Sequence, residues 1–185
     1  MKKSALIAIG FSALFTATTQ ASELTIDIGN DAFRTEFVTT ELGNNSEFSI
    51  AVLATDNDIN VYSAKGLVSG RVEEVNGLNA SLGVKTYYLD IDHVDNEFGF
   101  GLGGEVSFKI PSSPRLQVET HFYYSPGITF SGDIDYITDF SVRGSYQLLK
   151  NGEVYLGYRN LEANIKNAGS FDLNDGLNIG FKFLF

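Results

Sequence analysis

Apolar and polar residues alternate along most of this chain with a period of two. In the last eleven residues, apolar side chains recur at every second position: Leu177, Ile179, Phe181, Phe183 and Phe185. Successive side chains of a β-strand point to opposite faces, so this pattern predicts a strand with one wholly apolar face. Chain ends usually fray, so an apolar strand at this place is typical of a membrane β-barrel, whose strands face lipid on one side and the lumen on the other.

The same period predicts strands through the rest of the chain. It is clearest over residues 78–88, 98–110, 116–124, 140–148 and 154–159. It is weaker over residues 24–29, 33–41, 48–54 and 60–72. The stretch 33–41 is ambiguous, because Phe37 and Val38 would lie on opposite faces of one strand. No stretch keeps a helical apolar period over three turns, so we expect an all-β fold.

The connections between these strands alternate in length. Those near residues 73–77, 111–114 and 150–152 are short, whereas those near 90–96, 126–134 and 166–174 are longer and polar. Bacterial barrels have short periplasmic turns and long outer loops. This alternation also distinguishes a membrane barrel from the main alternative, a soluble β-sandwich or lipocalin-like barrel with its apolar faces turned inward.

The number of strands follows from parity. A break at Asn30–Asp31 divides residues 24–41 into two strands and gives ten in total, with both chain ends on the periplasmic side. Single-chain bacterial barrels have even strand numbers. We therefore expect an antiparallel transmembrane β-barrel of ten strands, with eight as the alternative if the N-terminal pair does not span.

The N-terminus has the features of an export signal. Lys2 and Lys3 precede an apolar run from Ala5 to Phe15, and small residues lie around Ala21. The run is shorter than the ~20 residues of a spanning helix, so we interpret residues 1–21 as a cleaved signal peptide and residues 22–185 as the barrel. Together with the final strand, this predicts a location in the bacterial outer membrane.

Composition narrows the partners. The formal net charge of −10 argues against nucleic acid, and the absence of cysteine excludes disulfides and thiolate chemistry. We expect a monomer whose partners are outer-membrane lipid, lipopolysaccharide and, during biogenesis, the barrel-assembly machinery. The last strand looks like the C-terminal signature that this machinery recognises, carried by Leu177, Ile179, Phe181, Phe183 and Phe185.

Charged residues gather on the other face of the strands, which would line the lumen. They are Lys85, Glu105, Lys109, Glu119, Arg143, Glu153, Arg159 and Lys182, with His121 beside them. A buried charge needs a partner, so we expect these groups to form a charge network across the lumen. A barrel of this size leaves room for little except side chains.

Three further patterns suggest chemistry. Asp90, Asp92, His93 and Asp95 form an acidic outer loop that could activate water, as in outer-membrane proteases of the omptin type, bind divalent cations that bridge to lipopolysaccharide, or simply be solvated. His121 has no serine two residues away, which favours a hydrogen-bonded lumen histidine over a catalytic one. Gly99–Gly104 fits a nucleotide-binding glycine pattern, but it lies inside a strand with no helix after it.

Several segments resemble the YfaZ family of small outer-membrane barrels. They are Phe98–Gly104, Phe122–Pro126, Val142–Tyr146, Val154–Leu161 and the final strand. The resemblance covers most of the chain after residue 21 and is looser in the N-terminal third. It implies an outer-membrane barrel, and it implies no established activity, substrate or catalytic residue.

The sequence therefore predicts an integral outer-membrane protein that is structural or narrowly channel-like, with a side-chain-filled lumen. The alternatives are a surface enzyme that hydrolyses lipid or peptide through His93 or His121, and a surface protein that binds a ligand or cation through its acidic loops. No cofactor, metal site or catalytic residue is assigned.

Overall fold

The computed structural model describes residues 22–40, 45–56, 59–91, 96–166 and 169–185, which form ten strands and one short 3₁₀ turn. The predicted signal peptide lies outside the described residues, and so do Asp92, His93 and Asp95 of the predicted acidic loop. The elements are β1 (Ser22–Gly29), β2 (Ala32–Thr39), β3 (Ser46–Thr55), β4 (Ile59–Arg71), β5 (Leu78–Ile91), β6 (Glu97–Lys109), β7 (Leu116–Pro126), η2 (Gly127–Thr129), β8 (Ile134–Leu149), β9 (Gly152–Ile165) and β10 (Gly169–Leu184). No helix among these residues is long and apolar enough to cross a membrane.

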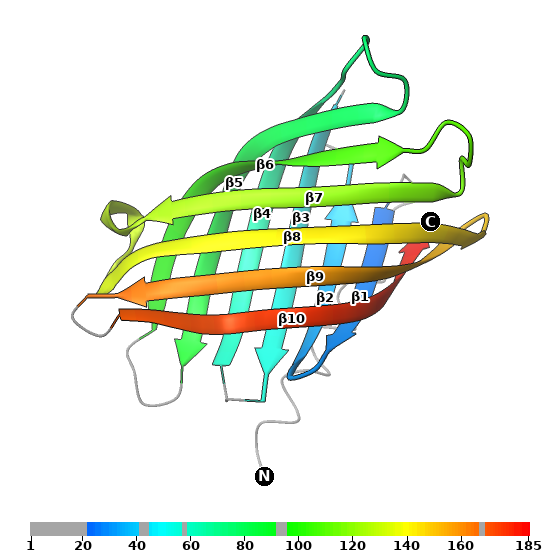
Figure 1. The fold of residues 1–185 in the computed structure, drawn as a ribbon. Coiled ribbons are helices and arrows are strands. Elements are labelled where there is room, and N and C mark those ends of the chain that lie inside the picture. The colour runs from blue at the N-terminus through cyan, green and yellow to red at the C-terminus, as the bar shows by residue number, and fades with distance from the viewer. Residues whose placement is uncertain (1–21, 41–44, 57–58, 92–95, 167–168) are drawn as a thin grey trace.

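The ten strands form one closed antiparallel barrel. Each strand pairs with its neighbour in sequence, and β10 closes the ring on β1, where Phe183 lies opposite Leu24 and Ile179 opposite Ile28. In Figure 1, strands β7–β10 cross in front of β2–β5. The division at Asn30–Asp31 is present, so the prediction of ten strands is confirmed and the eight-stranded alternative is wrong.

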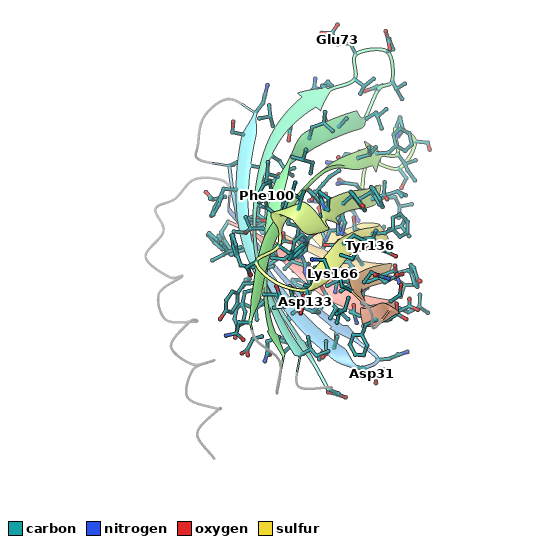
Figure 2. The ribbon with its side chains drawn as sticks, turned by 90° about the vertical axis from the view of Figure 1, so that its left-hand side faces the viewer. Asp31, Glu73, Phe100, Asp133, Tyr136 and Lys166 are labelled. Carbon is teal, nitrogen blue, oxygen red and sulfur yellow. The ribbon has the colours of Figure 1, made fainter. Side chains whose placement is uncertain are left out.

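The two ends of the barrel differ. We call one the terminal end, because β1 begins and β10 ends there, beside the turns at residues 72–77, 110–115 and 150–151. The other is the loop end, with the turn at Asn30–Asp31 and the segment 127–133. Figure 2 shows Glu73 of the terminal end and Asp31 of the loop end at opposite extremes of the molecule.

One connection is shorter than the sequence suggests. Residues 169–174 were expected in a polar loop, but they belong to β10, where Ser170 pairs with Asn164 and Asp172 with Glu162 of β9. A bulge follows between Asp172 and Asn174. Backbone pairing to β9 holds this stretch as a strand, and Leu173 within it is buried in the lumen.

The barrel wall has an apolar outside. Leu82, Leu102 and Ile179 are 74%, 66% and 64% exposed, while inward-facing Lys85, Arg159 and Lys182 are buried. A soluble barrel requires the reverse arrangement, so the alternation places the apolar faces toward lipid. The fold is a transmembrane β-barrel.

The lumen changes character along the barrel axis. At the loop end it holds a cluster of buried apolar side chains, which we call the apolar plug: Leu53, Ile59, Val61, Tyr87, Leu89, Ile134, Ile137, Leu161, Ala163 and Leu173. These residues come from β3–β5 on one side and β8–β10 on the other. The plug therefore spans the lumen from wall to wall.

The segment between β7 and β8 folds over the plug. Phe130 packs against it and lies on Gly99, where a Cβ atom would be 2.4 Å from the phenylalanine ring. The backbone N–H of Asp133 donates to the buried carboxylate of Glu97 at 3.0 Å, and Lys166 N–H donates to the Asp133 carbonyl at 2.9 Å. Figure 2 shows Asp133 and Lys166 close together at this end. These contacts hold the segment across the barrel mouth.

Candidate functional site

The middle of the lumen is occupied by charged groups, and the first set of them surrounds Asp27 of β1. Both terminal nitrogens of Arg159 donate to its two carboxylate oxygens at 3.1 and 3.2 Å. The Tyr155 hydroxyl donates to Asp27 at 2.7 Å, and Arg34 lies 3.5 Å away. Asp27 is 2% exposed. A buried carboxylate is stable only with such partners.

A second set connects β2, β4 and β6. Arg34 donates to Glu36 at 2.6 Å, and the Ser49 hydroxyl donates to the other Glu36 oxygen at 2.9 Å. The Lys65 ammonium lies 3.4 Å from Glu36 and 2.6 Å from Glu105. Lys65 thus bridges two carboxylates on strands that are not hydrogen-bonded to each other.

A third set is centred on Asp139 of β8. Lys85 donates to it at 2.5 Å and the Tyr87 hydroxyl at 3.0 Å, both from β5. His121 Nε2 lies 3.1 Å from the other Asp139 oxygen, and His121 Nδ1 lies 3.2 Å from the Ser141 hydroxyl. Ser141, His121 and Asp139 therefore form a continuous chain of hydrogen bonds.

The fourth set lies nearest the terminal end. Glu119 accepts from Arg143 Nε and, at 3.2 Å, from the Lys182 ammonium across the lumen. Lys182 also lies 3.6 Å from Glu23 and 3.9 Å from Glu153. One oxygen of Glu153 is buried and makes no hydrogen bond within the part of the chain that the structure describes.

A polar cavity of about 490 Å³ occupies the terminal end of the lumen. Its lining includes Lys109, Gln117, His121, Ser141 and Arg143. Deeper in the lumen, among the charged sets, lie two cavities of about 20 Å³ each, space for roughly one water molecule apiece. Beyond them is the apolar plug.

The profile of the YfaZ family, described as "YfaZ precursor", matches residues 1–185. The chain belongs to this family. The family description and the barrel together indicate an outer-membrane or secreted protein. The comparison with curated proteins found no match.

Two of the solved structures that resemble the chain are both from channels. One is the outer-membrane channel DcaP of Acinetobacter baumannii, with 11% identity and a TM-score of 0.47 over 86% of this chain and 54% of that chain. The other is the KdgM porin, with 11% identity and a TM-score of 0.46 over 90% of this chain and 99% of that chain. The chain spans about half the length of DcaP.

Most of the residues predicted for the lumen face it in the structure. Lys85, Glu105, Glu119, His121, Arg143, Arg159 and Lys182 take part in ion pairs or hydrogen bonds there, and Glu153 lies beside Lys182. Lys109 differs, because it is exposed at the rim of the cavity and makes no ion pair with another described residue. Its position at the last residue of β6 explains this.

Sequence reasoning missed the buried charged members Asp27, Arg34, Glu36, Lys65 and Asp139 of the network. It also missed Glu23, 3.6 Å from Lys182, and Glu47, 3.9 Å from Lys65. Asp27 lies between Ile26 and Ile28, and Asp139 directly precedes Phe140, so their places on the polar faces were a usable signal. Arg34 and Glu36 lie in the ambiguous stretch, where Val38 also faces the lumen and hides the period. Lys65 lies in a strand with a weak pattern.

The acidic loop looks different from its prediction. Asp90 lies within β5, paired with Asn60 of β4, and is not part of a loop. Side chains alternate along β5, and the odd-numbered Tyr87 and Leu89 face the lumen, so the even-numbered Asp90 faces outward. No group of three acidic or histidine side chains suited to a metal ion occurs among the described residues.

The predicted C-terminal signature lies where a receptor outside the barrel can reach it. Leu177, Ile179 and Phe183 are exposed on the outer face, and the Phe181 and Phe183 ring centroids are 4.2 Å apart. Phe185 follows the end of β10 and is 62% exposed. Recognition of this face by the assembly machinery stays a prediction.

Proposed function

We propose that the protein is an integral protein of the bacterial outer membrane whose barrel is closed to ions and whose interior opens only toward the periplasm. The observation that carries this proposal is the apolar plug, which spans the loop end of the lumen while a polar cavity opens at the terminal end.

The sidedness rests on the two ends of the chain and on the turns. The start of β1, the end of β10 and the three short turns all lie at the terminal end. Short turns face the periplasm in outer-membrane barrels, so the cavity would face the periplasm and the plug the cell exterior. The apolar outer wall suits contact with lipid, including lipopolysaccharide at the outer leaflet.

Closure rests on two successive barriers. A hydrated ion entering from the cavity first meets ion pairs that cross the lumen, such as Lys85 with Asp139 and Lys182 with Glu119. It then meets the plug, where an ion would lose its water without gaining a partner, at a cost of many kcal/mol. The paired charges also connect opposite walls, which supports a structural role for them.

Single cysteines test this arrangement, because the chain has none of its own. Ser107→Cys places a thiol in the cavity lining, and Ile128→Cys places one at the loop end, where Ile128 is 93% exposed. A maleimide too large for porins should label Ile128→Cys on intact cells. It should label Ser107→Cys only after the outer membrane is made permeable.

Two results would oppose the proposal. Labelling of Ser107→Cys from outside would mean an inverted or open barrel. Labelling of neither variant on intact cells, with both labelled in the soluble periplasmic fraction, would mean a protein outside the membrane.

A further inference from the structure

A serine, a histidine and an aspartate meet in the lumen in an order that nucleophilic catalysis uses. Ser141 Oγ lies 3.2 Å from His121 Nδ1, and His121 Nε2 lies 3.1 Å from Asp139 Oδ1. The three residues come from adjacent strands, since His121 of β7 pairs directly with Ser141 of β8 and Asp139 stands two positions before Ser141. Strand register therefore produces the arrangement, which no local motif reveals.

The hydrogen bonds fix the state of the imidazole ring. Asp139 only accepts as a carboxylate, so Nε2 carries the ring hydrogen and Nδ1 is left as the acceptor for the Ser141 hydroxyl. Lys85 and Tyr87 hold the same carboxylate in place at 2.5 and 3.0 Å. The ring is thus oriented by a group that is itself fixed, which is the logic of a nucleophile, a base and an orienting acid.

The arrangement is open to small molecules. Ser141 and His121 both line the cavity of about 490 Å³ at the terminal end. Arg143, the next inward-facing residue of β8, lines the same cavity, and its guanidinium is held beside Ser141 by the bond from its Nε to Glu119. A cation near the nucleophile stabilises the oxyanion that forms when a carbonyl is attacked.

We propose that Ser141, with His121 as its base, is the nucleophile of an acyl-transfer site that hydrolyses small polar carboxylic esters entering from the terminal end. Ser141 Oγ bonds to the ester carbonyl carbon while its proton passes to His121 Nδ1. The bond from carbon to the alcohol oxygen breaks, and that oxygen takes the proton from His121. Water then attacks the acyl-serine through His121, releasing the acid and restoring the Ser141 hydroxyl.

The cavity restricts the substrate class. Its volume and its charged lining, with Glu105 and Lys65 on one side and Arg143 on the other, suit a small polar ester and exclude a long acyl chain. The catalytic residues are Ser141 and His121. Asp139 is a positioning residue, because it acts on the ring and not on the ester.

Covalent labelling tests the nucleophile. Diisopropyl fluorophosphate transfers its phosphoryl group to an activated serine, with loss of fluoride and of the hydroxyl proton. The folded protein in detergent should gain one adduct on Ser141, seen by intact mass and peptide mapping. Ser141→Ala should gain none, and His121→Gln should react at least about 10²-fold more slowly, the usual scale of base catalysis.

Ser145→Ala is the matched control. Ser145 also faces inward from β8, is 2% exposed, and its hydroxyl makes no hydrogen bond to a described residue. This variant should label like the parent protein. An adduct on Ser145, equal labelling of Ser141→Ala, or no adduct on the parent protein would each overturn the proposal.

Hydrolysis of p-nitrophenyl acetate separates catalysis from structure. Asp139→Asn should lower kcat about tenfold or more with KM little changed, because the ring loses its orientation while the cavity persists. Each variant must first show the heat-dependent gel shift of a folded barrel. A folded Ser141→Ala protein that hydrolyses the ester at the parent rate would contradict the site. The test measures ester hydrolysis and not ion conductance, so the acyl-transfer proposal can fail or hold whether or not the lumen is closed to ions.

Discussion

Arg159 of β9 and Asp27 of β1 are 132 positions apart in sequence, yet two guanidinium nitrogens of Arg159 lie 3.1 and 3.2 Å from the two carboxylate oxygens of Asp27. The pair bridges the seam where the last strands meet the first, because β10 alone stands between β9 and β1. Barrel closure and charge pairing are therefore coupled at this point.

Arg159→Leu should destabilise the barrel by about 3 kcal/mol, since it leaves the buried Asp27 with the more distant Arg34 and the Tyr155 hydroxyl. Urea unfolding of the lipid-reconstituted protein, followed by circular dichroism, measures this change. The double variant Asp27→Leu with Arg159→Leu should recover part of the loss, because no buried charge is left without its partner. A double variant less stable than the single one would oppose this account.

The acids around Lys182 should differ in their contribution to stability. Glu119→Gln should cost about 2–4 kcal/mol, because Glu119 neutralises both Arg143 and Lys182 in a half-buried site. Glu153→Gln should cost less than about 1 kcal/mol, since Glu153 lies 3.9 Å from Lys182 and one of its oxygens makes no hydrogen bond to a described residue. The same urea titration compares them, and equal costs would contradict the assigned geometry.

Gly180 makes room for the ring that binds Asp27. A Cβ atom there would lie 2.3 Å from Cζ of Tyr155. Gly180→Ala should therefore push the Tyr155 hydroxyl from Asp27 and cost about 1–3 kcal/mol. Gly144→Ala is the matched control, because nothing lies within 4 Å of its Cβ position, and it should leave stability within about 0.5 kcal/mol.

Removal of Phe185 should separate assembly from stability. Phe185 lies beyond the β10 ladder and is exposed, so the purified truncated chain should refold in detergent like the parent protein. In cells, the heat-modifiable form should decrease strongly in the outer-membrane fraction if the assembly machinery reads this residue. Equal amounts of folded barrel in cells would show that Phe185 carries no assembly signal.

Sequence alternation predicted the wall of the barrel better than its interior. Most outward positions of β5–β9, such as Leu82 and Leu102, follow the period, whereas Asp90, Asn160 and Glu162 near the loop end are polar. Inward positions obey no single rule. Leu53 of β3 and Leu89 of β5 face the lumen at the loop end and belong to the plug. Lys65 of β4 and Lys85 of β5 also face the lumen, but they lie nearer the terminal end and pair with acids.

The partners of each lumen charge could not be read from sequence. Lys85 and Asp139 are 54 positions apart and lie on strands that are not neighbours, so their meeting depends on strand tilt and on the width of the barrel. The chain from Ser141 through His121 to Asp139 depends on a register that a shift of one residue would destroy. A search for serine near His121 along the chain cannot find it.

Planar-bilayer recording of the purified, heat-modifiable protein tests the closed lumen most directly. The account predicts no steady current steps at voltages and protein amounts at which a general porin, inserted under the same conditions, gives clear steps. Reproducible ion-selective steps that require the folded barrel would contradict it, because ions would then be crossing both the paired charges and the apolar plug.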